Sequence, residues 1–198
     1  VSEENPAWQI RVLFGDFCWE SPKLSQIILE QCFEHVIRWK NSPDGTLSLR
    51  DSKKEFYENP RFLRRTAVVN GYEYDYFIHL PEKKTKEQLQ GLPLVFTVHG
   101  RGEPAWLFTT KNGWDRLADE TGEFILVSPD SPGNIWFLPR DGMVFPEIVY
   151  KMEEEFGIDT SRIYLTGFSN GGMIVREVAI SYPHLFAGVS PWNAPVGN

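Results

Sequence analysis

The sequence predicts an α/β protein built around a doubly wound, mostly parallel β-sheet. Residues 92–100 and 124–130 are nearly continuous apolar runs that end in Gly or in Pro-Asp, a pattern typical of strands buried on both faces of a parallel sheet. Amphipathic stretches of helical period separate such runs. Because strand and helix patterns alternate along the chain, we expect helices on both faces of one sheet.

The chain is expected to divide into an N-terminal helical extension, residues 1–62, and an α/β core, residues 63–198. Apolar side chains at three- and four-residue steps predict an amphipathic helix at about Lys23–Lys40, followed by a turn and a charged connector. This segment carries no motif that indicates chemistry. His35, on or beside the apolar face of the helix, is expected to be structural.

The core begins with alternating residues at 72–80, which predict a half-buried strand near a sheet edge. The two buried runs follow. Between them, Thr109–Gly122 is predicted to be helical and to end at its glycine. Trp114, Leu117 and Ala118 are expected to face inward from this helix.

The second half of the core continues the alternation of helices and strands. Val144–Phe156 predicts an amphipathic helix, residues 161–167 a short buried strand, and Asn170–Tyr182 a third helix. Residues 185–197 are expected to supply the sixth strand and its exit. The helix at 144–156 is expected to bury Phe145, Ile148, Val149 and Met152.

Composition and charge narrow the classes of function. The chain has 198 residues, of which 41% are hydrophobic, and its formal net charge is −7, with 20 Lys and Arg scattered among 27 Asp and Glu. We therefore expect a globular protein without a nucleic-acid partner. No run approaches the ~20 apolar residues of a membrane span, and the N-terminus lacks the pattern of a signal peptide. Cys18 and Cys32 are interpreted as buried thiols, or as one bridge if the protein is secreted.

The sequence contains no motif for a metal ion or for a dinucleotide cofactor. The four histidines are isolated and show no metal-ligand spacing, and no G-x-G-x-x-G motif opens the first helix of the core. No metal and no cofactor is therefore expected.

A G-x-S-x-G motif places Ser169 between a predicted strand and a predicted helix, in the segment TGFSNGGM. This strand–turn–helix context is where such a serine acts as a nucleophile. Gly167 and Gly171 are expected because side chains there would collide with the neighbouring strand and helix. Since the N-terminal amides of the helix point at the site, the backbone N–H of Asn170 is expected to bind a developing oxyanion.

The ordered motifs resemble the polyhydroxybutyrate depolymerase and feruloyl esterase group of α/β-hydrolases. The chain shows NGYEYDYFIHLP, VHGRGE, NGWDRLADETGEF, SPDSPGNIWF, IDTSRIYLTGFSNGGM and YPHLFAGVSPWNAP in the order of that group, between about Thr66 and Gly197. The resemblance implies an α/β-hydrolase fold and a serine esterase that acts on carboxylic esters. It implies Ser169 as nucleophile, with backbone amides of Asn170 and Arg101 as the oxyanion hole. Arg101 stands where the group has a cysteine after "HG", and the NIWF loop also lacks a cysteine.

The substrate pocket is expected to involve His99, Trp136 and Phe168, with Trp106 nearby. The aromatic rings of Trp106, Trp136 and Phe168 could bind an aromatic acyl group. His99 is also expected to brace the oxyanion turn that it precedes. Hydroxyacyl, feruloyl and acetyl esters all remain open as substrates, small or polymeric.

The remaining members of a catalytic triad are not apparent after Ser169. In this fold the order is Ser, then Asp or Glu, then His, and the following part of the chain offers only Glu177 and His184. Glu177 is expected to point away from the serine, and His184 to lie beyond the far end of the helix. We therefore expect this chain to be one piece of a longer esterase.

The sequence also allows other interpretations of the chain's function. A second polypeptide could carry the C-terminal part of the hydrolase domain, or the chain could be a non-catalytic or truncated α/β-hydrolase that binds a partner. A serine peptidase of the prolyl-oligopeptidase type is a further alternative, although the upstream propeller domain of that type is absent from this sequence. Localisation is open between secreted and cytoplasmic, and the resemblance favours secretion.

Overall fold

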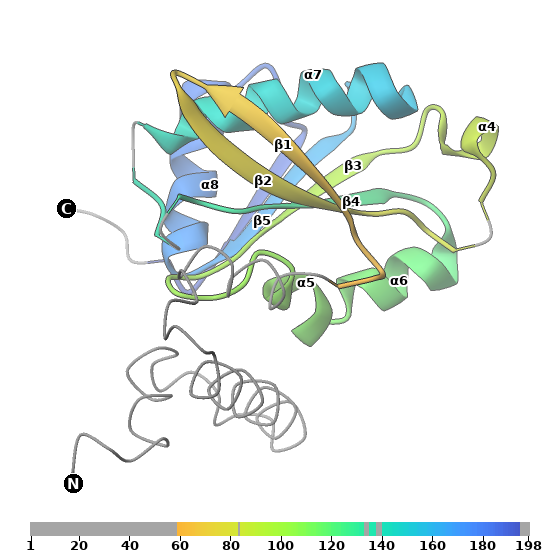
Figure 1. The fold of residues 1–198 in the computed structure, drawn as a ribbon, viewed down its shortest axis with the longest axis horizontal. Coiled ribbons are helices and arrows are strands. Elements are labelled where there is room, and N and C mark those ends of the chain that lie inside the picture. The colour runs from red at the N-terminus through yellow and green to blue at the C-terminus, as the bar shows by residue number, and fades with distance from the viewer. Residues whose placement is uncertain (1–58, 83, 133–134, 138–139, 195–198) are drawn as a thin grey trace, which may run out of the picture. The chain divides into compact units, whose positions relative to one another are not determined.

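The computed structural model describes residues 59–82, 84–132, 135–137 and 140–194 (Figure 1). The expected helix at Lys23–Lys40, together with His35, Cys18 and Cys32, lies outside these residues. The division of the chain at residue 62 therefore stays a prediction. No helix in the described part of the chain combines the length and apolar character of a membrane span.

The described residues form a six-stranded sheet with the order β1-β2-β4-β3-β5-β6. Strands β3, β4, β5 and β6 run parallel to one another, whereas β2 pairs antiparallel with both β1 and β4. The predicted α/β class with a mostly parallel sheet is thereby confirmed. The strands are β1 Leu63–Val69, β2 Tyr72–His79, β3 Leu94–Val98, β4 Ile125–Pro129, β5 Ile163–Phe168 and β6 Gly188–Trp192.

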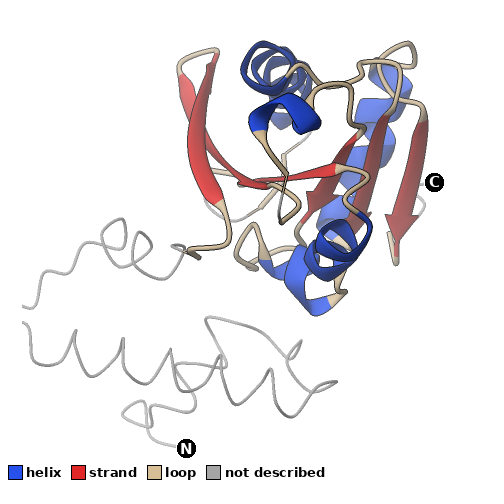
Figure 2. Ribbon diagram, turned by 90° about the vertical axis from the view of Figure 1, so that its right-hand side faces the viewer, coloured by secondary structure: helices blue, strands red, loops and turns tan. Residues whose placement is uncertain are grey.

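Helices cover both faces of this sheet (Figures 1 and 2). Helices α7 and α8 pack on one face, where they meet Phe96 and Val98 of β3 in the main core. On the other face, Val95 and Leu126 pack against Ala118 of α6. The helices are α4 Lys86–Leu89, α5 Leu107–Lys111, α6 Trp114–Thr121, the 3-10 helix η2 Asp141–Met143, α7 Val144–Phe156 and α8 Asn170–Ser181.

Helix α7 matches its prediction from Val144 to Phe156, and the four side chains expected to be inward are buried. Its periodicity predicts the helix well because one apolar stripe meets the sheet while the opposite side faces water.

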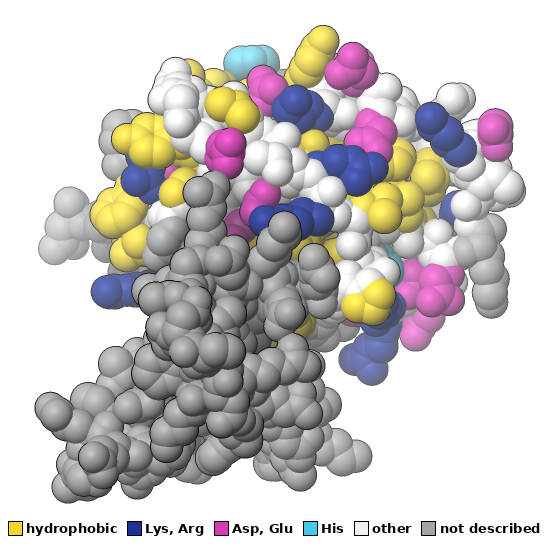
Figure 3. All heavy atoms as spheres, viewed as in Figure 1, with side chains coloured by type: hydrophobic (Ala, Val, Ile, Leu, Met, Phe, Trp, Pro, Cys, Tyr) yellow, Lys and Arg dark blue, Asp and Glu magenta, His cyan; other side chains and the backbone are white. Residues whose placement is uncertain are grey.

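On the face drawn in Figure 3, basic and acidic side chains of the described residues are interspersed.

The expectation that residues 72–80 form a strand near the sheet edge is confirmed, because β2 is the second strand of the sheet and β1 pairs along its outer side. The expectation that this strand is half-buried is wrong in part. Phe77 and His79, which alternate with the apolar residues and were expected on the other face, are 1% and 2% exposed. His79 can be buried because it is hydrogen-bonded on both sides of its ring, as described below.

The single helix predicted over Thr109–Gly122 is two helices, α5 and α6. They meet at Gly113, whose φ of +73° is left-handed and interrupts the helix. Gly122 ends α6 in the same conformation, as predicted. Ala118 is buried as expected, but Leu117 is 43% exposed and Asp115 is 2% exposed, so the inward assignment of Leu117 is wrong.

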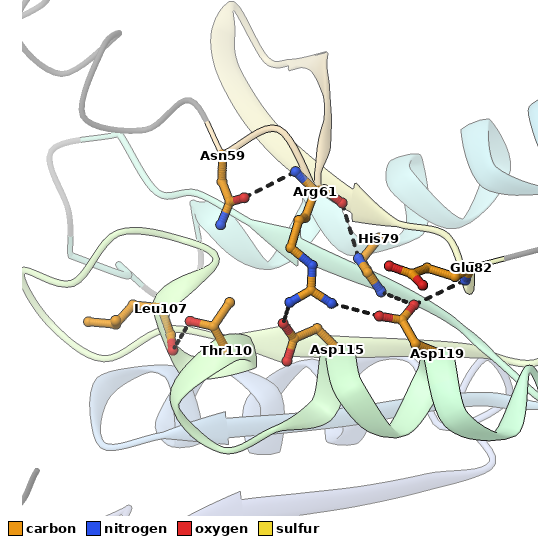
Figure 4. A network of polar contacts seen from close by, with 8 residues as sticks. All are labelled: Asn59, Arg61, His79, Glu82, Leu107, Thr110, Asp115 and Asp119. Atoms are coloured by element: carbon orange, nitrogen blue, oxygen red, sulfur yellow. Dashed lines mark hydrogen bonds and ion pairs between the residues drawn. The ribbon is translucent and has the colours of Figure 1, made fainter. Parts of the chain in front are cut away.

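The side of α6 that carries Asp115 faces a charged network rather than an apolar surface (Figure 4). Arg61 donates from Nη1 to Asp115 and from Nη2 to Asp119, each over 2.6 Å. His79 bridges Arg61 O, 3.0 Å from Nδ1, and Asp119 Oδ1, 2.8 Å from Nε2. The network fastens the start of β1 to α6.

Asp119 makes this network sensitive to acid. Burial acts to raise the pKa of its carboxyl, but the Glu82 N–H, His79 and Arg61 outweigh burial and hold the pKa below its usual value. A lowered folded-state pKa stabilises the fold above the unfolded pKa of about 3.9, and this stabilisation is lost as pH falls through the folded value.

We therefore expect Asp119→Asn to lower the free energy of unfolding by about 1–3 kcal/mol at pH 7. The difference from the native sequence should shrink below about pH 4. Urea unfolding across this pH range measures it, and Glu120→Gln on the exposed side of α6 is the control. A difference that is constant with pH would contradict the role of the ionised carboxylate.

Candidate active site

Ser169 occupies a sharp turn between β5 and α8. Its backbone has φ +53° and ψ −116°, a conformation that side-chain-bearing residues rarely adopt and that costs about 1–3 kcal/mol. Two hydrogen bonds hold the turn: Ser169 N–H donates to Trp192 O over 2.9 Å, and Met173 N–H donates to Ser169 O over 3.0 Å. The strain is therefore maintained by β6 on one side and by the first turn of α8 on the other.

The glycines around Ser169 are required by close backbone approaches. A Cβ on Gly167 would lie 2.6 Å from Gly171 O. A Cβ on Gly171 would lie closer than 3.0 Å to the carbonyl oxygens of Val98 and His99. Gly172, whose role was not predicted from the sequence, is less tightly confined, because its Cβ would lie 2.9 Å from the Cβ of Ala194. The start of α8 thus touches both β5 and the end of β3.

The turn that follows β3 lies beside this elbow. Residues Gly100 to Glu103 form a β-turn closed by Glu103 N–H donating to Gly100 O over 3.3 Å. Gly102 has φ +77° while Arg101 is not among the positive-φ residues, which is the pattern of a type II turn. A Cβ on Gly100 would lie 3.1 Å from Phe168 Cδ1, so the turn and the residue before Ser169 are in contact. The structure therefore places the turn that contains Arg101 next to the elbow that contains Asn170.

Asn170 has a second function in the structure that sequence reasoning missed. Its side-chain Oδ1 accepts from the Trp136 N–H over 2.7 Å, and its Nδ2 donates to Trp136 O over 3.3 Å. The Trp136 indole N–H in turn donates to His99 O over 3.1 Å. Trp136 thereby links the elbow to the turn after β3. The spacing of these residues in the sequence gives no sign of the contact.

His99 and Trp136 are buried, with 0% and 3% exposure, and their rings lie 5.2 Å apart. His99 Nδ1 lies 2.7 Å from Gly100 O, so this nitrogen carries a proton, and Nε2 faces Asp130 Oδ1 at 3.4 Å. Phe168 is half-buried and stacks on Phe108. Trp106 is half-buried as well. The assignment of His99, Trp136 and Phe168 to a substrate pocket stays a prediction.

Asp141 anchors the loop that carries Trp136. The carboxylate is fully buried and accepts from Phe137 N–H over 2.6 Å, from Tyr74 Oη over 2.8 Å, and from the Arg140 guanidinium over 2.5 and 3.0 Å. Burial, followed by the hydrogen bond to Asp141, raises the pKa of Tyr74 to about 12. The hydrogen bond to Asp141 likewise raises the pKa of Arg140 above its usual value. Phe137 and Arg140 are near Asp141 in the sequence, but the contact with Tyr74 joins it to a strand 67 residues earlier.

The only candidates that the sequence offers after Ser169 lie away from it. His184 is exposed and follows the C-terminal end of α8, whereas Ser169 immediately precedes its N-terminal end. At about 1.5 Å of rise per residue, the length of α8 separates the two. Glu177 forms an ion pair with Arg176 over 3.0 Å. Within the described residues, no group of three His, Cys, Asp or Glu is arranged to hold a metal ion.

A strained serine between a buried parallel strand and the N-terminus of a helix, in a sheet of this order, defines an α/β-hydrolase fold. Solved structures agree with this class. The acetyl xylan esterase from Aspergillus awamori superposes with a TM-score of 0.60 at 20% identity, over 67% of this chain and 52% of that one.

Curated sequences of esterases are similar to the same chain. The bifunctional acetylxylan esterase/xylanase XynS20E of Neocallimastix patriciarum is 30% identical over 107 residues, which are 52% of this chain and 16% of that protein. Poly(3-hydroxyalkanoate) depolymerase C of Paucimonas lemoignei is 30% identical over 112 residues, 50% of this chain and 27% of that protein. Feruloyl esterase B of Thermothelomyces thermophilus is 31% identical over 107 residues, 48% of this chain and 36% of that protein.

No family model matches the sequence. The matched segments span between 16% and 36% of the lengths of these three relatives. The predicted resemblance to the depolymerase and feruloyl esterase group of α/β-hydrolases is confirmed by these similarities.

Proposed function

We propose that this chain carries the nucleophile and the oxyanion hole of a serine carboxylesterase. The backbone of Ser169 is the observation that carries the proposal, because φ +53° combined with ψ −116° lies outside the regions that residues with side chains ordinarily adopt. Strain of this kind persists at functional sites, where it exposes a nucleophile at the N-terminus of a helix. The sequence similarity to esterases supports the same assignment.

The reaction begins when Ser169 Oγ attacks the carbonyl carbon of the ester. A C–O bond forms, and the carbonyl oxygen becomes an oxyanion that the backbone amides of Asn170 and Arg101 bind. Collapse of this intermediate breaks the ester C–O bond, the proton taken from the serine hydroxyl passes to the leaving oxygen, and the alcohol departs from an acyl-serine. Water then attacks the acyl carbon, releases the carboxylic acid and restores the hydroxyl.

A serine hydroxyl reacts in this way only when a base removes its proton. Since His184 follows the far end of α8, we propose that the histidine and its orienting carboxylate come from polypeptide that completes the hydrolase domain. Such polypeptide either continues this chain or is a separate chain bound to it. The lengths of the relatives support this part of the proposal.

The proposed substrates are acetyl, feruloyl or hydroxyacyl esters, small or polymeric. Each of these chemistries is named for one of the similar proteins. An assay of the native protein, with all polypeptide that copurifies with this chain, against acetylated xylan, methyl ferulate and poly(3-hydroxybutyrate) tests the proposal. We expect hydrolysis of at least one. Failure with all three and with an activated p-nitrophenyl ester would contradict it.

A further inference from the structure

Glu103 is a buried carboxylate in the turn that supplies the proposed oxyanion amide. It is 7% exposed. Its Oε2 accepts from the Gly100 N–H over 2.8 Å, and its Oε1 accepts from Lys111 Nζ of α5 over 2.7 Å. Glu103 is the last residue of the VHGRGE motif, whereas Lys111 belongs to none of the quoted motifs. Both oxygens of a buried charge are therefore satisfied, one by the backbone of the turn and one by a lysine.

Lys111 connects this carboxylate to the elbow. Its Nζ lies 4.8 Å from the centroid of the Phe168 ring, within the range of a cation–π contact. Phe168 immediately precedes Ser169 and touches the Gly100 turn. The pair formed by Glu103 and Lys111 thus lies between the two segments from which the oxyanion amides are proposed to come.

The hydrogen bond to Glu103 restrains the peptide next to the proposed donor. The backbone bond that closes the turn is long, 3.3 Å, whereas the bond from Gly100 N–H to the carboxylate is 2.8 Å. A charge-assisted bond of this kind is stronger than a bond between neutral groups. Because Arg101 follows Gly100, fixing the Gly100 amide limits how far the Arg101 N–H can turn away.

A carboxylate at this place also creates an electrostatic difficulty. Negative charge develops on the substrate oxygen in the transition state, and a nearby anion in a partly desolvated site opposes it. Lys111 balances the charge of Glu103 at a distance of 2.7 Å. The carboxylate can then hold the turn without repelling the oxyanion.

We propose that Glu103 and Lys111 are positioning residues of the oxyanion turn, in which Glu103 fixes the Gly100 amide and Lys111 neutralises the carboxylate. The inference rests on the proposed esterase function. Substitutions of this pair should therefore change kcat rather than substrate affinity, because the negative charge on the substrate oxygen develops only in the transition state.

A double-mutant cycle on the native protein tests the charge balance with p-nitrophenyl acetate. We expect Lys111→Met to lower kcat by about 10-fold with KM changed less than about twofold, because the methionine keeps the apolar stem over Phe168 but leaves the carboxylate uncompensated. Adding Glu103→Gln to Lys111→Met should raise kcat again by about fivefold or more, since the unbalanced charge is removed. Lys86→Met, an exposed lysine of α4, is the control.

Two results would overturn the inference. If the losses of kcat in the two single variants simply add in the double variant, the pair acts only by packing. If kcat is unchanged in Lys111→Met, the charge of Lys111 does not affect the transition state. Inactivity of the native protein, with no labelling of Ser169, would instead refute the proposed function.

Amide hydrogen exchange gives a readout that does not depend on activity. The Gly100 amide should exchange slowly in the native sequence and in Glu103→Gln, which keeps an acceptor, and at least about 10-fold faster in Glu103→Ala. Equal exchange in all three forms would show that Glu103 does not hold the turn. If Glu103→Ala fails to fold, the kinetic cycle of Lys111→Met with Glu103→Gln, which does not use that variant, still decides the inference.

Discussion

Replacing Ser169 by alanine is expected to abolish ester hydrolysis and covalent labelling by a fluorophosphonate, with kcat reduced about 10⁴-fold or more. The alanine keeps the backbone turn but removes the oxygen that forms the acyl-enzyme. Labelling followed by gel fluorescence, together with steady-state kinetics on the native protein and all its polypeptide, measures both effects.

Ser181→Ala at the other end of α8 is the matched control, since this exposed serine lies a full helix away from the elbow. It should be labelled and active like the native sequence. Labelling of Ser169→Ala at the native rate would place the nucleophile elsewhere.

The substitution Gly171→Ala is expected to destabilise the domain by about 4 kcal/mol or more, or to prevent folding. The added Cβ would lie closer than 3.0 Å to the carbonyl oxygens of Val98 and His99, and both are backbone atoms at the end of a buried strand. Neither α8 nor β3 can move without separating the elbow from the oxyanion turn. Urea unfolding followed by circular dichroism measures the loss of stability.

Gly142→Ala provides the comparison for this experiment. A Cβ there would meet only Val178 Cγ2 at 3.6 Å, an ordinary van der Waals distance. We expect it to change stability by less than about 1 kcal/mol. If Gly171→Ala were as mild as Gly142→Ala, the close approach of α8 to the end of β3 would be wrong.

The elements that the sequence predicted well are those whose environment is uniform. Strands β3 and β4 are buried on both faces, and α7 has one apolar stripe, so their patterns can be read without knowing their neighbours. Strand β1 was missed because most of its side chains are exposed. The burial of Asp115 and His79 depends on Arg61, which is distant from both in sequence, so periodicity alone assigned His79 to the exposed face.

The same distinction holds for the candidate site. Ser169 and its glycines form one continuous motif, so their roles could be proposed from the sequence. The contacts of Asn170 with Trp136 and of Asp141 with Tyr74 join residues that are far apart in the chain. Only the folded arrangement reveals that the loop of Trp136 connects the elbow to the turn after β3.

The most direct test of the proposed function is to trap the acyl-enzyme. The native protein, with all copurifying polypeptide, is mixed with p-nitrophenyl acetate, quenched in acid during turnover, digested and analysed by mass spectrometry. The peptide that contains Ser169 should carry one acetyl group in the native sequence and none in Ser169→Ala. Turnover with an unmodified Ser169 peptide, or with the acetyl group on another residue, would contradict the assignment of Ser169 as the nucleophile.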